Sequence, residues 1–223
     1  MKTDIKDYIF SSLAISFLLF ISVLFAYLLA GILDSRLGIH NLLLNISLFV
    51  IAYGVSSIFY VGALNRIYPS DEGTYEMDHV QFTLWKHHAI IGELGRSVIQ
   101  LFIFPVFLRP VFYSLFGARI GKCVAIGGTI TDPPLIEIGD YAILGQDSVL
   151  ASHTMISNKF FLKQIKVGKR TTVGINAVIM PGVEIGENSV VAPGAVVQMD
   201  TKIPPNEVWG GVPARKLKDI EPS

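Results

Sequence analysis

Two long stretches of uncharged residues stand near the N-terminus. Residues 8–33 and residues 41–65 each lack Asp, Glu, Lys, Arg and His, and a short polar segment joins them. About 20 apolar residues in a helix suffice to cross the hydrocarbon core of a bilayer. We therefore predict a transmembrane hairpin of two helices over residues 1–66. A secretory signal peptide is the alternative for the first stretch, but its apolar part is too long and no convincing cleavage site follows it.

Basic residues flank the two predicted spans unevenly. Lys2 and Lys6 precede the first span and Arg66 follows the second, whereas the connecting segment carries only Arg36. Lys and Arg near the ends of a span favour the cytoplasmic side of a membrane. We therefore expect both termini and the C-terminal domain to face the cytoplasm, in a multi-pass protein of a bacterial-type inner (plasma) membrane.

Residues 67–118 are predicted to connect the membrane hairpin to a C-terminal domain. They begin with a polar stretch that contains His87 and His88, for which we expect an interfacial or structural role. An apolar segment rich in aromatic residues follows, and it is too short to span a bilayer. We predict that residues 97–118 lie on the membrane surface. An ordinary cap packed on the end of the next domain is an equally weighted alternative.

The second half of the chain repeats an aliphatic residue every six positions. The frame consists of Ile120, Ile126, Asp132, Ile138, Leu144, Leu150 and Ile156, and then Val167, Val173, Ile179, Ile185, Val191, Val197 and Ile203. Asp132 is its one polar member. A glycine often follows the aliphatic residue, and a small residue often stands four positions after it, as at Ala142, Ser148, Thr171, Ala177, Ser189 and Ala195.

A period of six fits neither an α-helix nor simple strand alternation. It fits short strands separated by turns, in which each strand points one aliphatic residue inward and three strands complete one coil. We therefore predict a mainly β fold over residues 119–223, a parallel β-helix of about five coils. The frame is interrupted between Ile156 and Val167, so residues 157–166 are expected to form an outward loop. Loops on rigid scaffolds often carry binding function.

Composition narrows the class of protein further. Hydrophobic residues make up 51% of the chain and charged residues 16%, which agrees with membrane segments and argues against disorder. The formal net charge is 0, so no global positive field attracts nucleic acid. The lone cysteine, Cys123, excludes an internal disulfide framework and a Cys-rich zinc site, and we interpret it as a small structural residue.

Three segments in the second half carry motifs beyond the repeat. They are Leu150-Ala-Ser-His-Thr-Met155, Val173-Gly-Ile-Asn-Ala-Val-Ile-Met-Pro-Gly-Val-Glu-Ile-Gly186 and Gly210-Gly-Val-Pro-Ala-Arg215. With the repeat they resemble the hexapeptide-repeat (isoleucine-patch) acyltransferases, in particular the maltose and galactoside acetyltransferase branch. The stretch from Glu72 to Ala151 also resembles the membrane-bound acyltransferase modules of poly-lysine-type peptide synthetases. The main resemblance covers about half the chain and implies a left-handed β-helix followed by a short C-terminal helix.

The same resemblance implies the chemistry of the protein. It assigns His153, the only histidine of the repeat, as the general base in a direct transfer of an acyl group from acyl-CoA to a hydroxyl or amine. It implies contacts with CoA at Gly174, Pro193, Gln198, Arg215 and Lys218, and a substrate contact at Asp132. It also implies homotrimers with sites between adjacent copies, and no metal. This chain departs from the sugar acetyltransferases at Gln198-Met199, where they carry Thr-Lys.

Structural interpretations remain open beside these roles. His153 can be a surface residue without function, and Asp132 before Pro133-Pro134 can cap a turn. The segment Arg215-Lys-Leu-Lys218 can be a solvated basic tail.

The leading hypothesis is a membrane-anchored acyltransferase, with O-acetylation from acetyl-CoA first, that acts on a sugar-like or lipid-linked acceptor at the bilayer. A non-catalytic trimeric membrane scaffold is the first alternative, since a fold alone does not establish a function. A γ-type carbonic anhydrase is the second, but its zinc site needs three histidines and the repeat has one.

Overall fold

The computed structural model describes residues 5–37, 42–101 and 106–221 of the chain. The chain divides into two compact units, one made of Met1–Pro69 with Thr83–Phe104 and the other of Ser70–Phe82 with Pro105–Ser223. The division falls inside helix α3 (Val80–Leu101), whose first turn belongs to the second unit.

The first unit is helical. Its helices α1 (Ile5–Leu37) and α2 (Leu42–Ile67) pack against each other, and both are long and apolar enough to cross a membrane. Large apolar side chains remain exposed along them, such as Phe20 at 66% and Phe59 at 74%. A helix that is apolar on all sides is typical of a membrane span. The two predicted apolar helices are confirmed, while Lys2 and the link 38–41 lie outside the described residues.

Polar contacts join α3 to the other helices of this unit. Lys86 Nζ donates a hydrogen bond to Asp7 Oδ2, and the two side chains are 8% and 10% exposed. The hydroxyl of Tyr60 in α2 lies 2.8 Å from His87 Nε2. Within α3 itself, His88 Nδ1 donates to the carbonyl of Leu84 at 2.9 Å. Burial lowers the pKa of His87, because an apolar environment disfavours the imidazolium ion.

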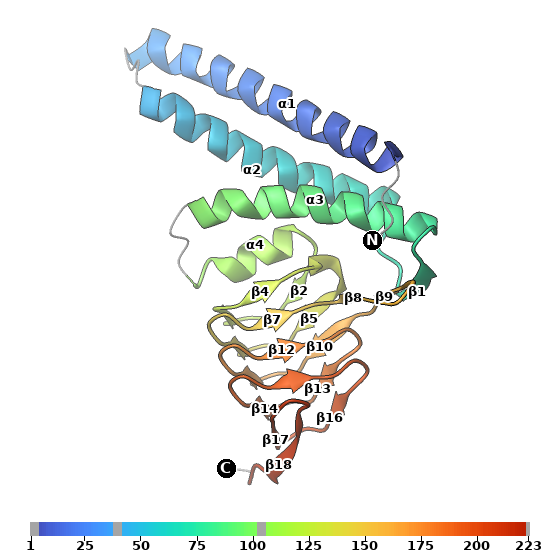
Figure 1. The fold of residues 1–223 in the computed structure, drawn as a ribbon. Helices are drawn as coiled ribbons and strands as arrows, with labels where there is room; N and C mark the ends of the chain where they lie inside the picture. The colour runs from blue at the N-terminus through green and yellow to red at the C-terminus, as the bar shows by residue number, and fades with distance from the viewer. Residues whose placement is uncertain (1–4, 38–41, 102–105, 222–223) are drawn as a thin grey trace. The chain divides into compact units, whose positions relative to one another are not determined.

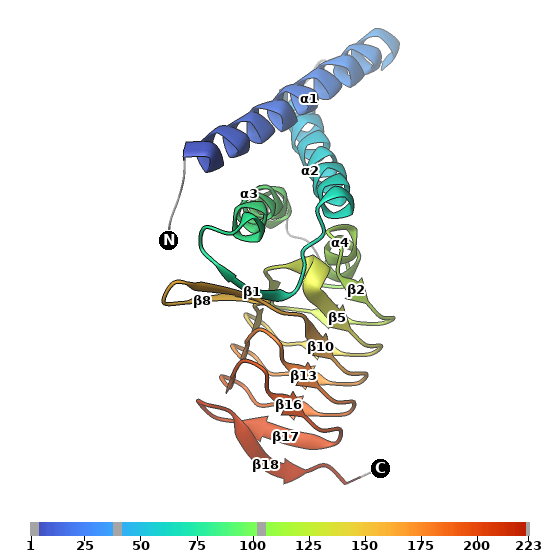
Figure 2. The same ribbon diagram turned by 90° about the vertical axis from the view of Figure 1, so that its right-hand side faces the viewer.

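Most strands of the second unit form three sheets, which the chain visits in turn (Figures 1 and 2). The strands of these sheets are short, and all except β18 pair in parallel. Sheet 1 contains β2 (Arg119–Ile120), β5 (Ile136–Ile138), β10 (Ile165–Val167), β13 (Glu184–Ile185) and β16 (Lys202–Ile203). Sheet 2 contains β3 (Ala125–Ile126), β6 (Ile143–Leu144), β11 (Thr172–Val173), β14 (Val190–Val191), β17 (Glu207–Gly210) and β18 (Arg215–Asp219). Sheet 3 contains β4 (Thr129–Ile130), β7 (Val149–Leu150), β12 (Val178–Ile179) and β15 (Val196–Val197). We call this stack of parallel strands the prism.

Aliphatic side chains from all three sheets fill the interior of the prism. Apart from Ile156, the frame residues from Ile126 to Ile203 that end a strand are at most 3% exposed, and the small residues Ala142, Ser148, Thr171, Ala177, Ser189 and Ala195 are completely buried. The glycines after the strands lie where successive layers approach closely. A Cβ at Gly139, for example, would lie 2.7 Å from the backbone nitrogen of Lys169. The six-residue repeat therefore sets the core as predicted, while the left hand and the number of coils stay predictions.

The structure corrects the frame at two positions. Ile130, not Asp132, pairs with Leu150 and fills the core, because the chain reaches sheet 3 two residues early and restores the register through the turn η1 (Pro133–Leu135). Ile156 is 50% exposed, and β10 takes its place beside β5. Asp132 and Ile156 therefore lie outside the aliphatic column.

The predicted loop 157–166 is instead the second half of a β-hairpin followed by β10. Strand β8 (His153–Ile156) pairs antiparallel with β9 (Lys159–Leu162), and β9 also pairs with β1 (Gly73–Glu76) from the start of the second unit. Phe160 and Leu162 are 0% and 1% exposed. Burial of these two side chains stabilises strands where the sequence pattern predicts a loop.

Helix α4 (Arg109–Leu115) and the residues after it contact the first strands of the prism. Tyr113 and Phe116 are buried, and the Tyr113 hydroxyl accepts a hydrogen bond from the backbone of Ile130 at 3.3 Å. Arg109 Nη1 donates to the carbonyl of Gly127 at 3.1 Å. These contacts are those of a cap on the prism, whereas the location of residues 97–118 on a membrane surface stays a prediction, and residues 102–105 lie outside the described chain.

The predicted C-terminal helix is wrong. The segment Arg215–Asp219 forms strand β18, which pairs antiparallel with β17. Gly211, at a φ of +95°, lies in the turn between them. The last strand of a stacked sheet leaves backbone donors and acceptors unpaired, and β18 satisfies them, which a short helix of Lys and Leu would not do.

Candidate active site

Asp132 and His153 meet at the corner between sheet 3 and sheet 1, which we call the His153 corner. Asp132 follows β4 and His153 follows Leu150 of β7, and both segments lead from sheet 3 to sheet 1. His153 Nδ1 lies 2.6 Å from Asp132 Oδ2. The Asp132 side chain is 10% exposed and the His153 side chain 26%, so the carboxylate is withdrawn from water while part of the imidazole is accessible.

Neighbouring groups fix the carboxylate in this place. Thr131 Oγ1 donates to Asp132 Oδ2 at 2.8 Å, and Ser152 Oγ donates to the carbonyl of Leu135, at the end of η1, at 3.4 Å. The Asp132 side chain makes no capping hydrogen bond to η1. Because an ionised carboxylate only accepts hydrogen bonds, His153 donates its Nδ1 proton to Asp132. That arrangement makes Nε2 the basic nitrogen of a neutral imidazole.

A charged cleft of about 410 Å³ lies on the outer side of sheet 1. Its lining includes Lys163, Lys166, Glu184, Asp200 and Lys202. Lys163 Nζ lies 2.5 Å from Asp200 Oδ2 and Lys202 Nζ lies 3.5 Å from Glu184 Oε1. The backbone of Lys163 donates to the carbonyl of Ser152 at 2.8 Å, so the cleft begins beside the residue that precedes His153. Its volume is within the range of small-molecule sites.

The residues predicted to contact CoA lie in three places. Gly174 and Pro193 lie on the corner between sheets 2 and 3, which we call the Gly174 corner, where a Cβ at Gly174 would lie 2.5 Å from the nitrogen of Pro193. Arg215 and Lys218 are exposed in β18, and Arg215 is opposite Gly210, whose neighbour Trp209 accepts a hydrogen bond from Ala192. Gln198 is exposed on the other corner, that of His153.

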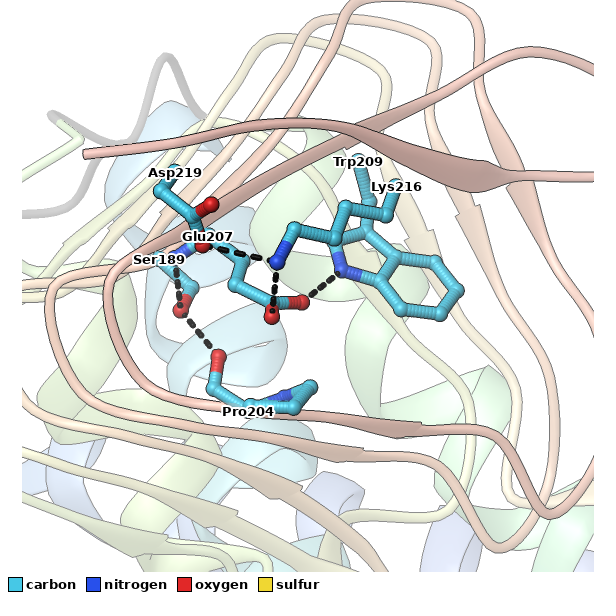
Figure 3. Close-up of polar contacts among 6 residues, drawn as sticks. All are labelled: Ser189, Pro204, Glu207, Trp209, Lys216 and Asp219. Atoms are coloured by element: carbon cyan, nitrogen blue, oxygen red, sulfur yellow. Dashed lines mark hydrogen bonds and ion pairs between the residues drawn. The ribbon is translucent and has the colours of Figure 1, made fainter.

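A buried carboxylate holds the C-terminal hairpin that carries Arg215 and Lys218 (Figure 3). Glu207 Oε1 accepts from Lys216 Nζ at 2.8 Å, and Glu207 Oε2 accepts from the Trp209 indole at 2.7 Å. Lys216 Nζ also lies 2.7 Å from Asp219 Oδ1. The hydrogen bond from Lys216, followed by that from Trp209, lowers the pKa of Glu207. The hydrogen bonds to Asp219 and Glu207 raise the pKa of Lys216.

Comparison with known proteins identifies the family. Residues 164–198 match the family described as "Bacterial transferase hexapeptide (six repeats)". The chain is 35% identical over 158 residues to galactoside O-acetyltransferase of Escherichia coli K12, an alignment that covers 66% of this chain and 75% of that protein. The chain belongs to the hexapeptide-repeat acyltransferase family.

Other relatives match this hexapeptide-repeat protein over a smaller part of their length. The chain is 31% identical over 99 residues to mitochondrial gamma carbonic anhydrase 1 of Arabidopsis thaliana, which covers 44% of this chain and 36% of that protein. A solved hexapeptide-repeat acetyltransferase of Vibrio cholerae, complexed with acetyl coenzyme A, is 29% identical, with a TM-score of 0.44 and coverage of 48% and 62%. The chain thus spans less than two thirds of either relative.

The described part of this hexapeptide-repeat chain contains no cluster of potential metal ligands. Within residues 5–37, 42–101 and 106–221, no group of three or more His, Cys, Asp or Glu side chains is placed to hold a metal ion. In the sequence as a whole, His153 is the only histidine after His88. The three-histidine zinc site of a γ-type carbonic anhydrase therefore has no counterpart in the prism.

Proposed function

We propose that this protein is a membrane-anchored acyltransferase that moves an acyl group, most simply acetyl, from acyl-CoA to a hydroxyl or amine of its acceptor. The observation that carries the proposal is the 2.6 Å contact between His153 Nδ1 and Asp132 Oδ2 at a corner of a hexapeptide-repeat prism. A histidine held by a buried carboxylate is a common arrangement of general bases. A scaffold without catalysis has no need for it.

His153 would act through Nε2. As the acceptor oxygen or nitrogen attacks the acyl carbonyl, Nε2 takes up the proton of the acceptor, and the same proton is then available to the departing thiolate. Asp132 stabilises the imidazolium that exists between the two transfers. CoA supplies an acyl group activated as a thioester, so no covalent acyl-enzyme is needed.

The chain offers suitable groups to an acyl-CoA donor. Arg215 and Lys218 are exposed in β18, and basic side chains of this kind can bind the phosphates of CoA. Gly174 and Pro193 present a corner with little side chain, along which an extended pantetheine arm can lie close to the backbone. Gln198 on the His153 corner is the remaining proposed contact.

We propose that the active site combines two copies of the chain in a homotrimer. The Gly174 corner and the His153 corner lie at opposite edges of sheet 3. Within a single copy of the chain, the proposed base is therefore apart from Gly174 and Pro193. Before the C-terminal hairpin of β17 and β18, the outer residues of sheets 2 and 3 are uncharged, for example Ile143, which is 49% exposed, and Val178. The outer row of sheet 1 instead carries Arg119, Glu137, Lys166, Glu184 and Lys202. Uncharged outer faces favour contact between copies.

The helical unit supports an acceptor at the membrane. If α1 and α2 span a bacterial-type inner membrane with both termini on the cytoplasmic side, the prism has access to cytosolic acyl-CoA. A lipid-linked glycan or another molecule held at the bilayer is then the acceptor class that an anchored enzyme meets most often, because anchoring raises the local concentration of membrane-bound substrates.

The test uses the full chain in detergent micelles or vesicles, with acetyl-CoA as donor and lipid-linked and soluble sugars as acceptors. Replacing His153 with Ala should lower the release of free CoA thiol by roughly 10²-fold or more, while the control Lys122→Ala, at an exposed residue near the first strands of the prism, keeps wild-type turnover. Turnover that survives in His153→Ala removes the proposed base. A wild-type chain that turns over no acceptor supports the scaffold, and stoichiometric zinc with CO2 hydration would instead support a carbonic anhydrase.

A shared site also makes a prediction for mixed assemblies. His153→Ala and Arg215→Glu damage different corners, so co-assembled chains of the two variants should recover part of the activity that each has lost. Mixed assemblies that stay as inactive as the parents would place both residues in a site within one chain.

A further inference from the structure

The segment Ser70–Phe82 belongs to the same unit as the prism although it lies between α2 and α3 in the sequence. Its strand β1 pairs antiparallel with β9, and β9 pairs with β8, which begins at His153. Gly73 is opposite Leu162, and Leu162 is opposite His153. The strand therefore completes a three-stranded sheet whose far edge carries the proposed base (Figures 1 and 2).

One face of this small sheet is closed by aromatic side chains. Cross-strand neighbours and alternate residues share a face, so His153, Phe160 and Leu162 lie on the same side. Phe160 is completely buried, and its ring centroid lies 6.4 Å from that of His153. Phe82, also completely buried, lies at a centroid distance of 5.1 Å from Phe160. The Phe160 ring therefore neighbours both the Phe82 ring and the imidazole of His153.

Polar contacts fasten the segment to the hairpin and to itself. Glu72 Oε2 accepts a hydrogen bond from the backbone of Gln164 at 3.1 Å, just after β9. Gln81 Nε2 donates to Asp71 Oδ2 at 3.2 Å, and this hydrogen bond links the end of the segment to its start. The Tyr75 ring, opposite Phe160 in the register, stacks on His79 at 4.9 Å. A two-stranded hairpin alone is marginally stable in water, whereas a third strand and a covered face stabilise it.

We propose that the segment 70–82 positions His153, and that Phe82 is a positioning residue that acts through Phe160. The inference rests on the proposed function, in which His153 is the base. Asp132 holds the imidazole at Nδ1, and Phe160 packs near the ring in the orientation that keeps this contact. Without the Phe82 ring, Phe160 gains space to move, and the imidazole reaches orientations in which Nδ1 no longer meets Asp132.

The experiment compares Phe82→Ala and Phe82→Leu with Phe116→Ala in the full chain. Phe116 is a matched control because it is 2% exposed, belongs to the same unit and packs on Phe112 at 4.7 Å. We expect Phe82→Ala to lower kcat by roughly 10- to 100-fold with an unchanged KM for acyl-CoA. Phe82→Leu, which refills most of the volume, should restore most of kcat, and Phe116→Ala should leave kcat near that of the wild type.

Nitrogen NMR of histidine-labelled protein provides a readout that does not need turnover. The His153 signal, assigned by its loss in His153→Ala, reports which ring nitrogen carries the proton. In the wild type and in Phe116→Ala we expect the Nδ1–H form, and in Phe82→Ala a mixture of both forms. A wild-type His153 signal in Phe82→Ala overturns the positioning role, whether or not the wild type is an acyltransferase.

Two further results would also overturn the inference. One is wild-type kcat in Phe82→Ala, and the other is an equal loss of kcat in Phe82→Ala and Phe116→Ala that follows their loss of thermal stability. Failure of the proposed function itself is recognised separately, as a wild-type chain with the Nδ1–H form of His153 and no release of CoA with any acceptor.

Discussion

The carboxylate of Asp132 and the imidazole of His153 are 21 positions apart in the sequence and 2.6 Å apart in space. Each stands where the chain leaves sheet 3, Asp132 after β4 and His153 after β7, one layer of the prism apart. The contact supports a second proposal for Asp132, beside the substrate contact that the family resemblance implies. In this proposal, Asp132 orients the proposed base and balances the charge that the base acquires.

Replacing Asp132 with Asn tests that role directly. If Asp132 orients His153, the variant should lose roughly 10²-fold or more in kcat and keep its KM for the acceptor. A variant that keeps kcat while its acceptor KM rises would restore the substrate-binding role instead. Asp140→Asn is the control, because Asp140 accepts a backbone hydrogen bond from Lys122 at 2.8 Å elsewhere in the prism. Steady-state kinetics with varied acceptor decides between them.

The corrected aliphatic frame makes a prediction about stability. Ile130 is completely buried, whereas Ile156, which the six-residue count places inside, is 50% exposed. Ile130→Ala should lower the free energy of unfolding by about 2–5 kcal/mol, and Ile156→Ala by no more than about 0.5 kcal/mol. Denaturant unfolding followed by far-UV circular dichroism measures both. Equal losses in the two variants would restore the frame predicted from the sequence.

Acid should loosen the C-terminal hairpin through Glu207. Its pKa is lowered from an ordinary value of 4.5 by the hydrogen bonds from Lys216 and Trp209. The unfolded chain therefore binds the proton more readily, and the stabilisation is complete above pH 4.5 and lost as the pH falls through the folded-state pKa. Hydrogen exchange of β18 between pH 3 and pH 6 should show this loss in the wild type.

Two variants distinguish the protonation of Glu207 from the effect of low pH on other groups. Glu207→Gln should expose β18 to exchange already near neutral pH and remove most of the pH dependence. Glu187→Gln, at an exposed glutamate of the prism, should leave the wild-type profile intact. A wild-type β18 whose exchange protection does not change with acid would contradict the role of Glu207.

The helical unit should weaken in mild acid through His87. Burial lowers the pKa of His87 from its ordinary value of 6.5, so the folded state disfavours the protonated ring that the unfolded state accepts. Stability is then complete above pH 6.5 and falls as the pH drops from 6.5 toward the folded-state pKa. Thermal unfolding of the detergent-solubilised chain from pH 7.5 to pH 5 should show a falling midpoint, and His87→Gln should flatten that fall. A midpoint that falls equally in His87→Gln would assign the effect to other groups.

Binding of the donor should depend on β18. Arg215→Ala should raise the KM for acyl-CoA by about 10-fold with kcat little changed, which is the expected loss of one charged contact with phosphate. Lys122→Ala, at an exposed lysine near the first strands, is the control. An unchanged KM in Arg215→Ala would return the segment Arg215–Lys218 to a solvated basic tail.

The sequence alone predicts two parts of the molecule: the long uncharged helices and the strands that follow the six-residue repeat. Uncharged stretches long enough for two helices give α1 and α2, and an aliphatic residue every six positions gives stacked parallel strands with Val173, Ile179 and Ile185 inside. Both inferences succeed because they depend on periodicity and length, which neighbouring residues encode locally. The motif around His153 also places a histidine beside the interruption of the repeat.

Tertiary structure decides what depends on contacts between distant segments. The sequence count misses the early arrival at sheet 3, because only pairing with Leu150 shows that Ile130 and not Asp132 is inside. It also misses β18, since pairing with β17 overrides the helical tendency of Lys and Leu. The contact between the rings of Phe160 and Phe82 and the hydrogen bond from His153 to Asp132 join residues far apart in the chain. The sequence around each of these residues carries no signal of its partner.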